Sequence, residues 1–402
     1  MNLVSEIDLP VFDYTAPGFS ADAYHAELEA AGRHGWLVRS QVAYIVLDHD
    51  SGEFFLRSRA TAFPGRQIAE YFGVTDGPLA AHIDANILNL TGERHRRIRA
   101  LTQHVFGAQA ADSWRPLMRG FLRNLWARVS AYRECDFVPA IARPYPALTI
   151  ATVLGAPHQD AGRLREWSSW VQRQFDIRAL QAHLPDIEHA VKDLEAYVSA
   201  QLQDRRLRPG DDLISALLAA RDGEDRLSTA ECTALVMNLL AGAIDTTAGQ
   251  LAHAIRLFAA HPHQWQLLAQ RPLLAASAVQ EVLRFEPVTP FTARICTQDI
   301  VHRGVLFPAG TIVAVCAERA NREGGDGDSF DIVAPRQARM LTFGAGPHHC
   351  LGVNLARAEL EEALAFLAPR MPDLALRTAP RLGGVEGIYG IDKLLITWSP
   401  AA

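Results

Sequence analysis

Apolar residues recur at helical spacing over most of the chain, and this pattern predicts a mainly α-helical protein. One helix is expected over residues 351–367, where leucines return with almost no helix breakers between them. A long central helix is expected to begin at Ser228, because Ser228 and Glu231 have the spacing of a capping box, and to end near Ala260. Between roughly residues 93 and 285 the sequence predicts only helices and loops.

Runs rich in Val, Ile and Leu near both ends of the chain predict a small β region. The expected strands cover residues 36–40, 44–47, 305–307, 311–315 and 394–398. The first two are predicted to form a hairpin, and the Pro-Ala-Gly sequence at 308–310 predicts a turn. No internal repeat or linker-like segment is present, so we expect a single domain over residues 1–402.

The predicted central helix is apolar until a polar interruption at residues 242–247, Gly-Ala-Ile-Asp-Thr-Thr. The hydroxyl of Thr246 has the spacing to bond the carbonyl of Gly242 four residues earlier, which tends to bend a helix. We therefore expect a bend or notch at this turn. Taken alone, Asp245 and the two threonines would equally suit a helix face exposed to solvent.

Composition and charge narrow the classes of function. With 402 residues, 49% of them hydrophobic, the chain is long enough to bury a large core. Its net charge of −6 argues against a general nucleic-acid-binding protein. The five cysteines are scattered and odd in number, which favours a reducing cytoplasm over a disulfide framework. The N-terminus lacks a signal-peptide pattern, and no run of about 18 apolar residues predicts a membrane anchor.

Cys350 lies in a glycine-rich string at residues 343–352, Phe-Gly-Ala-Gly-Pro-His-His-Cys-Leu-Gly. Because a helix is predicted to follow at once, Cys350 is expected at a helix N-terminus, where the dipole favours the thiolate. The glycines allow unusual dihedrals and the close approach of a flat ligand, whose face Phe343 can contact. A zinc site fits poorly, because the adjacent His348, His349 and Cys350 cannot easily converge on one ion.

The string resembles the haem-binding loop of the cytochrome P450 superfamily, Phe-Gly-x-Gly-x-His/Arg-x-Cys-x-Gly, at every position. This resemblance extends over nearly the whole chain and implies the cytochrome P450 fold. It also implies haem b, iron protoporphyrin IX, with Cys350 as the axial thiolate ligand and Phe343 and Gly344 beside the haem. In that family the thiolate donates electron density that favours O–O bond cleavage.

The resemblance also implies a role for the polar interruption in the central helix. Residues 242–247 are similar to the family's Ala/Gly-Gly-x-Asp/Glu-Thr-Thr. Thr246 is then implied to hydrogen-bond the bound dioxygen, and Asp245 to help relay protons to it from solvent. Ala243 stands where the family usually has a second glycine, so we expect a slightly smaller pocket at this point.

Another group of residues resembles the structural brace of the family's cysteine loop. Glu281 and Arg284 match its Glu-x-x-Arg helix. Ala334 occupies the usual position of the third member, an arginine, and Arg336 is expected to replace it. The nearby sequence Gly-Gly-Asp-Gly at 324–327 stands where an Asp-Pro pair is common, so the local geometry is expected to differ.

Haem propionates need cationic or hydrogen-bonding partners if they are to be buried. The resemblance implies that His95 and Arg99 serve this purpose, with further contacts from Arg294 and His348. The arginines at positions 96 and 97 are expected to face solvent. Such a basic surface would also suit an acidic electron-transfer partner.

By resemblance, four segments contribute side chains to a substrate pocket. Most of these side chains are apolar, which favours a largely hydrophobic substrate. The expected lining residues are Ile83, Ile87, Leu88, Leu239, Leu240, Ala243, Val288, Phe291, Thr292, Ile388 and Tyr389.

The resemblance therefore implies a haem-thiolate monooxygenase. It would use O2, and electrons from a ferredoxin and ferredoxin reductase, to hydroxylate or otherwise oxidise a small organic substrate. Two alternatives stay open at this point. A peroxygenase would use hydrogen peroxide, although a proton relay through Asp245 and Thr246 would then be dispensable. A haem-thiolate sensor or carrier would bind its ligand without turnover.

Overall fold

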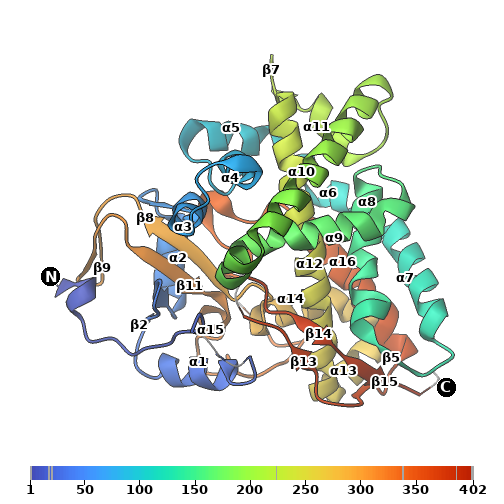
Figure 1. Cartoon of the computed structure of the whole chain (residues 1–402). Helices are drawn as coiled ribbons and strands as arrows, with labels where there is room; N and C mark the ends of the chain where they lie inside the picture. Colours follow the sequence, from blue (N-terminus) through green and yellow to red (C-terminus); the bar gives the residue numbers. More distant parts are fainter. Residues whose placement is uncertain are drawn as a thin grey trace.

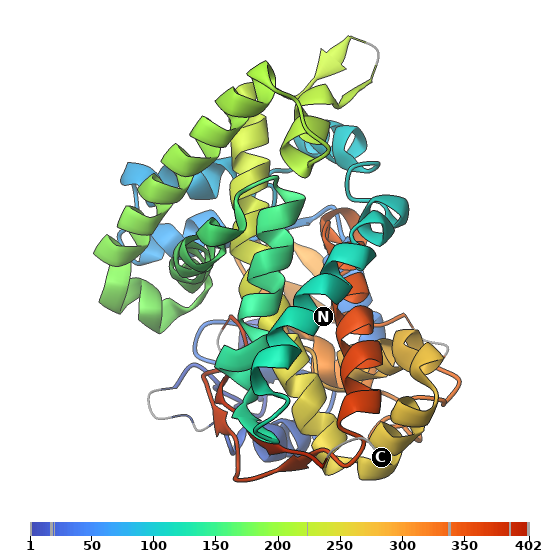
Figure 2. The ribbon, with the colours of Figure 1, turned by 90° about the vertical axis from the view of Figure 1, so that its right-hand side faces the viewer.

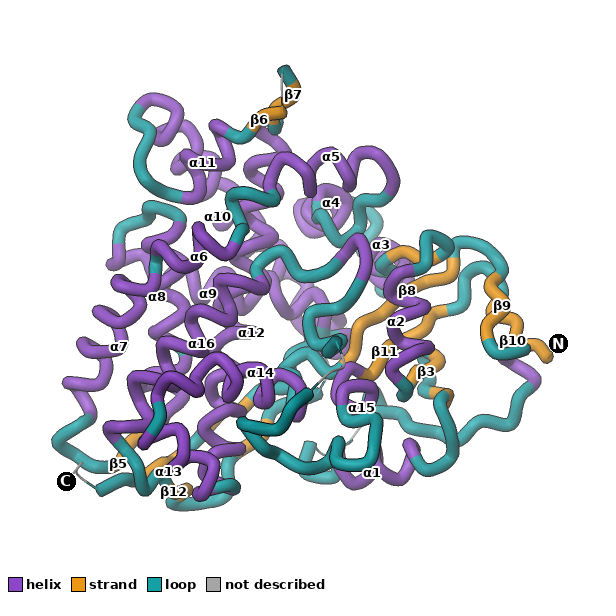
Figure 3. The backbone as a smooth tube through the Cα atoms, turned by 180° about the vertical axis from the view of Figure 1, so that it is seen from behind, coloured by secondary structure: helices purple, strands orange, loops and turns teal. Residues whose placement is uncertain are grey.

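The computed structural model describes residues 2–16, 19, 21–222, 224–336, 339–385 and 387–399. Helices make up most of the molecule, and the longer strands gather on the side where the N-terminus lies (Figure 1 and Figure 3). This arrangement confirms the prediction of a mainly α protein with a small β region.

The larger part of the molecule is built from helices (Figure 1). Those of the first half of the chain are α1 (Tyr24–Gly32), α2 (His49–Arg57), α3 (Gly65–Tyr71), α4 (Gly77–Ala85), α5 (Gly92–Thr102), α6 (Ala108–Ser113), α7 (Arg115–Val129), α8 (Pro144–Val153), α9 (Ala161–Gln172) and α10 (Ile177–Leu207). Those of the second half are α11 (Leu213–Ala219), α12 (Thr229–Ala260), α13 (Pro262–Gln270), α14 (Ala275–Phe285), α15 (Ala317–Asn321) and α16 (Val353–Leu367).

The strands are short, and the largest sheet has the order β2-β3-β11-β8-β4. The strands of the first half of the chain are β1 (Asn2–Leu3), β2 (Leu37–Arg39), β3 (Tyr44–Val46), β4 (Thr61–Ala62), β5 (Glu134–Asp136), β6 (Arg221–Asp222) and β7 (Asp225–Arg226). The others are β8 (Phe291–Cys296), β9 (Ile300–His302), β10 (Val305–Phe307), β11 (Ile312–Cys316), β12 (Ala375–Leu376), β13 (Arg381–Leu382), β14 (Ile391–Lys393) and β15 (Leu395–Thr397).

All five predicted strands are present, as β2, β3, β10, β11 and β15, and β2 pairs antiparallel with β3 as the predicted hairpin requires. The expectation that residues 93–285 hold no strand is wrong, because β5, β6 and β7 lie there. Strand β5 pairs with β15 near the C-terminus. A strand of three residues gains its pairing from a distant segment, so its own sequence carries little signal.

Helix α12 confirms the predicted central helix, including its start. The hydroxyl of Ser228 accepts from the Glu231 N–H at 3.2 Å, and the Glu231 carboxylate accepts from the Ser228 N–H at 2.8 Å. The expected bend is not seen as an interruption, because α-helical structure is continuous over Thr229–Ala260. Figure 2 shows α12 in yellow running through the helical part, with α16 in red beside it.

By length and composition alone, α12 is apolar enough to cross a membrane, in contrast to the expectation that no segment is. Half of its most apolar window is buried inside the protein, however, and it packs against α8, α9 and α10. A buried core helix passes the same test of length and hydropathy. We therefore interpret the apolar character of α12 as packing, since protein covers much of its surface.

Candidate functional site

The glycine-rich loop before α16 folds back on itself and presents Cys350 to a cavity. The N–H of Cys350 donates to the carbonyl of Phe343 at 2.9 Å, and the N–H of Gly344 donates to the carbonyl of Leu341 at 2.8 Å. Gly344 and Gly346 have φ angles of 69° and 68°, in the left-handed region that side chains rarely adopt. The expectation of unusual dihedrals therefore holds for these two glycines but not for Gly352, which has a φ of −86°.

Replacing Gly346 with alanine is expected to destabilise this loop. Besides the positive φ, a Cβ on Gly346 would lie 2.9 Å from the Cα of Arg57 and 3.1 Å from the carbonyl of Leu56, so backbone would have to move. We expect a loss of about 2 kcal/mol in the free energy of unfolding, measured by urea denaturation. Gly352→Ala is the matched control, because a Cβ there meets nothing within 4 Å. Equal losses in the two variants would contradict this account.

Cys350 is solvent-exposed and lines the cavity. Burial raises the pKa of its thiol, while the Gly352 N–H and the charge of Arg99 act in the opposite direction. Within the protein itself, burial therefore outweighs the groups that favour the thiolate, in contrast to the expectation from the helix N-terminus. Cys350 precedes the first residue of α16, Val353, and does not lie within the helix.

The cavity has a volume of about 830 Å³, and α12 forms another of its walls. Gly242, Ala243 and Thr246 line it, and the hydroxyl of Thr246 donates to the carbonyl of Gly242, as predicted. A Cβ on Gly242 would meet nothing within 4 Å, so this turn of the helix borders open space. A flat ligand lying against Cys350 would therefore have room between the loop and α12.

Asp245 is partly buried between α12 and α9 and is not among the residues that line the cavity. Burial raises the pKa of its carboxyl, partly offset by a hydrogen bond with Ser169 and by the charges of Arg143, Arg165 and Arg173. The neighbouring Thr246 faces the cavity. The two residues therefore connect the cavity wall with the α9 side of the helix, and Ser169 is a partner that the sequence analysis missed.

Four cationic or ionisable side chains meet at the edge of the cavity. The rings of His95 and His348 lie 4.3 Å apart, centroid to centroid, and Arg99 and Arg294 line the cavity beside them. Burial lowers the pKa of Arg294 to about 10, and burial together with His95, Arg294 and Arg99 lowers that of His348 to about 3. Within the described part of the chain, no carboxylate forms an ion pair with either arginine. This edge is therefore built to receive an anionic ligand.

Arg96 and Arg97, which were both expected to face solvent, differ in their surroundings. Arg96 has a side chain that is 74% exposed, as expected for a solvated face. Arg97, in contrast, pairs with Glu231 at 2.8 Å and with Asp225 at 2.9 Å, so it ties α5 to the start of α12. The expectation that Arg97 simply faces solvent is wrong, because the capping-box glutamate lies within its reach.

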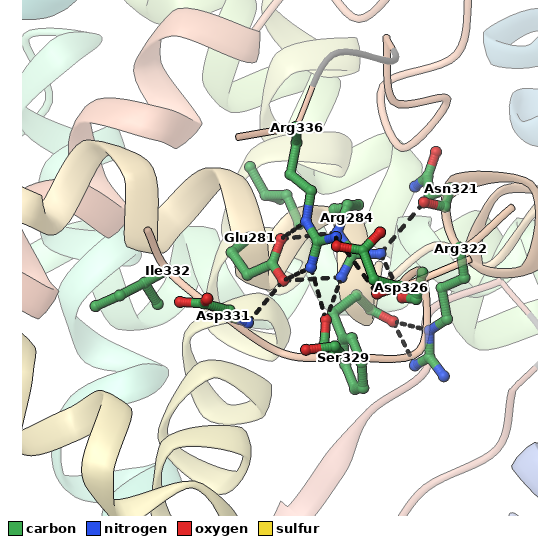
Figure 4. A network of polar contacts seen from close by, with 12 residues as sticks. Glu281, Arg284, Asn321, Arg322, Asp326, Ser329, Asp331, Ile332 and Arg336 are labelled. Atoms are coloured by element: carbon green, nitrogen blue, oxygen red, sulfur yellow. Dashed lines mark hydrogen bonds and ion pairs between the residues drawn. The ribbon is translucent and has the colours of Figure 1, made fainter. Parts of the chain in front are cut away.

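The predicted brace forms a network of polar contacts centred on the buried Glu281 and Arg284 (Figure 4). Arg284 donates two hydrogen bonds to Glu281, at 2.7 and 2.8 Å, and Arg336 donates to the same carboxylate at 3.0 Å. Glu281 also accepts from the N–H of Asp331 at 2.9 Å. One carboxylate thus joins α14 to two points of the segment at 326–336, and Arg336 occupies the place of the third member.

The Gly-Gly-Asp-Gly sequence has a clear packing reason at its last position. The carbonyl of Gly327 accepts from Arg284 at 2.7 Å. A Cβ on Gly327 would lie 1.7 Å from the carbonyl oxygen of Arg322, which no side chain could tolerate. The segment therefore packs tightly onto the brace even though it departs from the common family sequence.

Replacing Arg336 with alanine is expected to lower the free energy of unfolding by about 1.5–3 kcal/mol. The reason is that Glu281, with only 2% of its side chain exposed, would lose a charged hydrogen-bond donor. Urea denaturation followed by circular dichroism measures the effect. Arg33→Ala is the control, because the Arg33–Glu29 pair is 68% exposed on both sides and is expected to contribute little. An equally small effect at Arg336 would contradict its role in the brace.

Comparison of the sequence with known proteins identifies the family to which these residues belong. The cytochrome P450 family model matches residues 165–367. The chain is 35% identical to luteothin monooxygenase of Streptomyces thioluteus over 98% of its own length and 97% of that protein. The chain belongs to the cytochrome P450 family.

Other P450 proteins are similar over most of the chain. Mycinamicin IV hydroxylase/epoxidase of Micromonospora griseorubida is 34% identical, covering 73% of this chain and 74% of that protein. A structure of epothilone D-bound cytochrome P450epoK matches with a TM-score of 0.88 at 25% identity, over 97% and 99% of the two chains. The chain is therefore a P450 monooxygenase, an enzyme class that holds haem through an axial cysteine thiolate.

The residues around the P450 cavity fit haem. Of the five cysteines, Cys350 is the one that lines the cavity. Arg99 and Arg294 at its edge form no ion pair with a carboxylate among the described residues, and they suit the two propionates. Phe343 and Gly344 line the cavity beside Cys350. The donor set and the charge of the site therefore agree with the cofactor of the family.

Most of the expected substrate-pocket residues line the cavity, but three do not. Leu240 is fully buried, and its backbone carbonyl accepts from the Ser168 hydroxyl of α9 at 2.6 Å. Tyr389 is also fully buried and packs against His253 and Tyr24. Ile388 is likewise absent from the wall. The residues that do line the cavity are Ile83, Ile87, Leu88, Leu239, Ala243, Val288, Phe291 and Thr292.

Two amide side chains of α12 hold parts of the pocket in place, and the sequence analysis missed their role. Asn238 accepts from the N–H of Ile87 at 2.8 Å, and Gln250 accepts from the N–H of Val288 at 2.9 Å. Both line the cavity. Their signal in the sequence was a polar residue within an apolar helix, but the partner of each lies far away in the chain.

Proposed function

We propose that this enzyme uses haem b, iron protoporphyrin IX, with Cys350 as its axial ligand, to insert one atom of O2 into a small, largely hydrophobic organic substrate. The observation that carries the proposal is a single cavity lined by both Cys350 and Thr246. Haem bound there supplies the electron transfer and oxygen activation that side chains do not. We further propose that residues 1–402 act as a single P450 domain.

The side chains at the cavity edge bind and orient the cofactor in this proposal. Arg99 and Arg294 pair with the propionates, and His95 and His348 complete that contact surface. These pairs would neutralise cations that otherwise stay buried without a counter-ion. Glu281, Arg284 and Arg336 do no chemistry; they hold the segment that supports the cysteine loop.

Thr246 and Asp245 move protons in this proposal. The Thr246 hydroxyl lies at the cavity wall and donates its one proton to the carbonyl of Gly242. While that bond is present its oxygen can only accept a hydrogen bond from a group in the cavity, and it can donate there only after the bond to Gly242 is broken. Asp245 transfers protons toward Thr246 from the α9 side of the helix, where Ser169 forms a hydrogen bond with its carboxyl group. A carboxyl with a raised pKa keeps a proton to a higher pH than an exposed aspartic acid does, which suits a relay.

The substrate is proposed to be largely hydrophobic because most side chains on the cavity wall are apolar. One relative is named as a hydroxylase/epoxidase of mycinamicin IV, and one similar solved structure is described as bound to epothilone D. The proposed outcome is hydroxylation or another oxidation of the substrate, and the position attacked depends on how Ile87, Val288 and Phe291 orient the molecule.

Electrons are proposed to come from a ferredoxin and its reductase in the cytoplasm. Burial, followed by the charges of Arg99, Arg357, Arg339 and Arg57, lowers the pKa of His349, next to Cys350 in the chain. Of these arginines, Arg57 pairs with Glu53 at 2.7 Å and Arg99 is assigned to a propionate. Arg339 and Arg357 are therefore the ones proposed to make the surface beside the cysteine loop positive, although the whole chain carries −6. Such a surface attracts an acidic protein.

The proposal is tested by comparing two sources of oxidant with the same substrate. With ferredoxin, ferredoxin reductase, NADPH and O2, we expect product formation that matches NADPH consumption. With hydrogen peroxide alone, we expect slower turnover, since the proton relay serves O2 rather than peroxide. Faster turnover with peroxide would favour a peroxygenase, and binding without product under either condition would favour a sensor or carrier.

A further inference from the structure

The part of the cavity wall away from the cysteine loop carries no formal charge among the residues that the structure describes. The charged side chains on the wall are Arg99, Arg294 and Glu359. Both arginines lie at the edge assigned to the propionates. Glu359 belongs to α16 and is buried, and burial raises its pKa well above the usual range, which favours the neutral form. The rest of the wall consists of apolar side chains, hydroxyls and amides.

Arginines that neighbour wall residues in the chain are engaged elsewhere. Arg66 bonds to Glu70 at 2.8 Å and pairs with Asp84 at 3.5 Å. Arg173 lies over the ring of Trp170 at 3.9 Å. Arg178 donates to the carbonyl of Thr15 at 2.9 Å and to that of Ala16. None of the residues outside the described part of the chain is Lys, Arg or His.

We infer that the pocket selects uncharged substrates and discriminates against free carboxylates. A carboxylate that enters an apolar pocket loses its hydration, and it recovers that loss only if a cation or several hydrogen-bond donors meet it. Arg99 and Arg294, the cations of this cavity, are assigned to the haem propionates and are not available to a substrate carboxylate. This inference rests on the proposed function, because it concerns the substrate pocket of the same enzyme.

Amides on the wall give neutral polar groups a way to bind. The Oε1 of Gln172 and the Nδ2 of Asn238 are buried without a partner in the described structure. Both side chains line the cavity. The Gln172 oxygen would accept from a hydroxyl and the Asn238 amide nitrogen would donate to an ester or ketone, while the Asn238 oxygen keeps its bond to the Ile87 N–H. The pocket therefore suits a hydrophobic molecule that bears uncharged oxygen functions.

The test compares tetradecanoic acid with its methyl ester at pH 8, where the acid is ionised. Binding is measured by competition with 4-phenylimidazole, which reports occupancy whether or not the spin state changes. We expect the ester to bind at least about tenfold more tightly than the carboxylate. The acid should gain affinity as the pH falls and it becomes neutral. Equal or tighter binding of the carboxylate at pH 8 would overturn the inference, as would failure of the ester to bind.

A pair of variants tests the physical cause. Gln172→Lys places a cation on the wall, and Gln172→Met adds a side chain of similar length without charge. We expect Gln172→Lys to narrow the ratio of ester to acid affinity by at least about threefold, and Gln172→Met to leave that ratio unchanged. The same change in both variants, or none in Gln172→Lys, would overturn the electrostatic explanation.

The carbon monoxide spectrum separates this inference from the proposed function. A red-shifted Soret band in the reduced protein, together with preference for the acid, would overturn only the inference about charge. Absence of that band would overturn the proposed function itself, whichever ligand binds.

Discussion

Cys350→Ala is expected to abolish monooxygenase activity and the red-shifted Soret band of the reduced, carbon monoxide-bound protein. Cys350 is the one cysteine that lines the cavity, so no other thiolate can take its place. Haem binding should weaken as well, although the cations at the edge would still contact the propionates. Turnover should fall to that of a haem-free control, measured with ferredoxin, reductase and NADPH.

A matched control separates loss of the ligand from general damage. Cys135 is partly buried in β5, away from the cavity, and Cys135→Ala should keep both the band and the activity. Circular dichroism should show the same helical content in the two variants. A normal red-shifted band in Cys350→Ala would contradict the assignment of the axial ligand.

Thr246→Ala is expected to uncouple the enzyme, so that NADPH is consumed without matching product. Without its hydroxyl, the cavity wall loses the one group of Thr246 that can exchange hydrogen bonds with the cavity, which the Gly242 carbonyl holds in place. Asp245→Asn should slow product formation by about 10²-fold, because the amide cannot pass on a proton. The measurements are product formed, NADPH consumed and hydrogen peroxide released.

Two comparisons make this prediction specific. Thr233 lies on the same helix and bonds the Thr229 carbonyl at 3.0 Å, but it does not line the cavity, so Thr233→Ala should stay coupled. Peroxide-driven turnover should survive in Thr246→Ala, since peroxide arrives already reduced. Full coupling in Thr246→Ala, or equal loss of peroxide-driven turnover, would contradict the relay.

Features that depend on neighbouring residues were predictable from the sequence. The capping box at Ser228, the back-bond from Thr246 and the glycine-rich turns before Cys350 all involve residues within about one or two turns of each other. Their geometry follows from local sterics and hydrogen bonding. The β2–β3 hairpin is local in the same sense.

Features that depend on distant contacts were predicted less well. Leu239 and Leu240 are adjacent in the sequence, yet only Leu239 lines the cavity, because successive helical residues point about 100° apart. The side of α12 that faces the cavity depends on where α9 and the cysteine loop pack. The prediction that Tyr389 lines the cavity is wrong for a similar reason, because its ring packs against His253 and Tyr24 in the core.

By itself the sequence determined the class of protein, through a ten-residue string around Cys350 and a polar interruption in an apolar helix. Only the tertiary structure decided that Asp245 contacts Ser169 and that Arg97 pairs with Glu231. It also decided that Leu240 and Tyr389 lie in the core and not on the cavity wall. The physical reason is how far apart along the chain the interacting residues lie. Backbone conformation follows from adjacent residues, whereas charge pairing and cavity walls arise where segments far apart in the chain pack together.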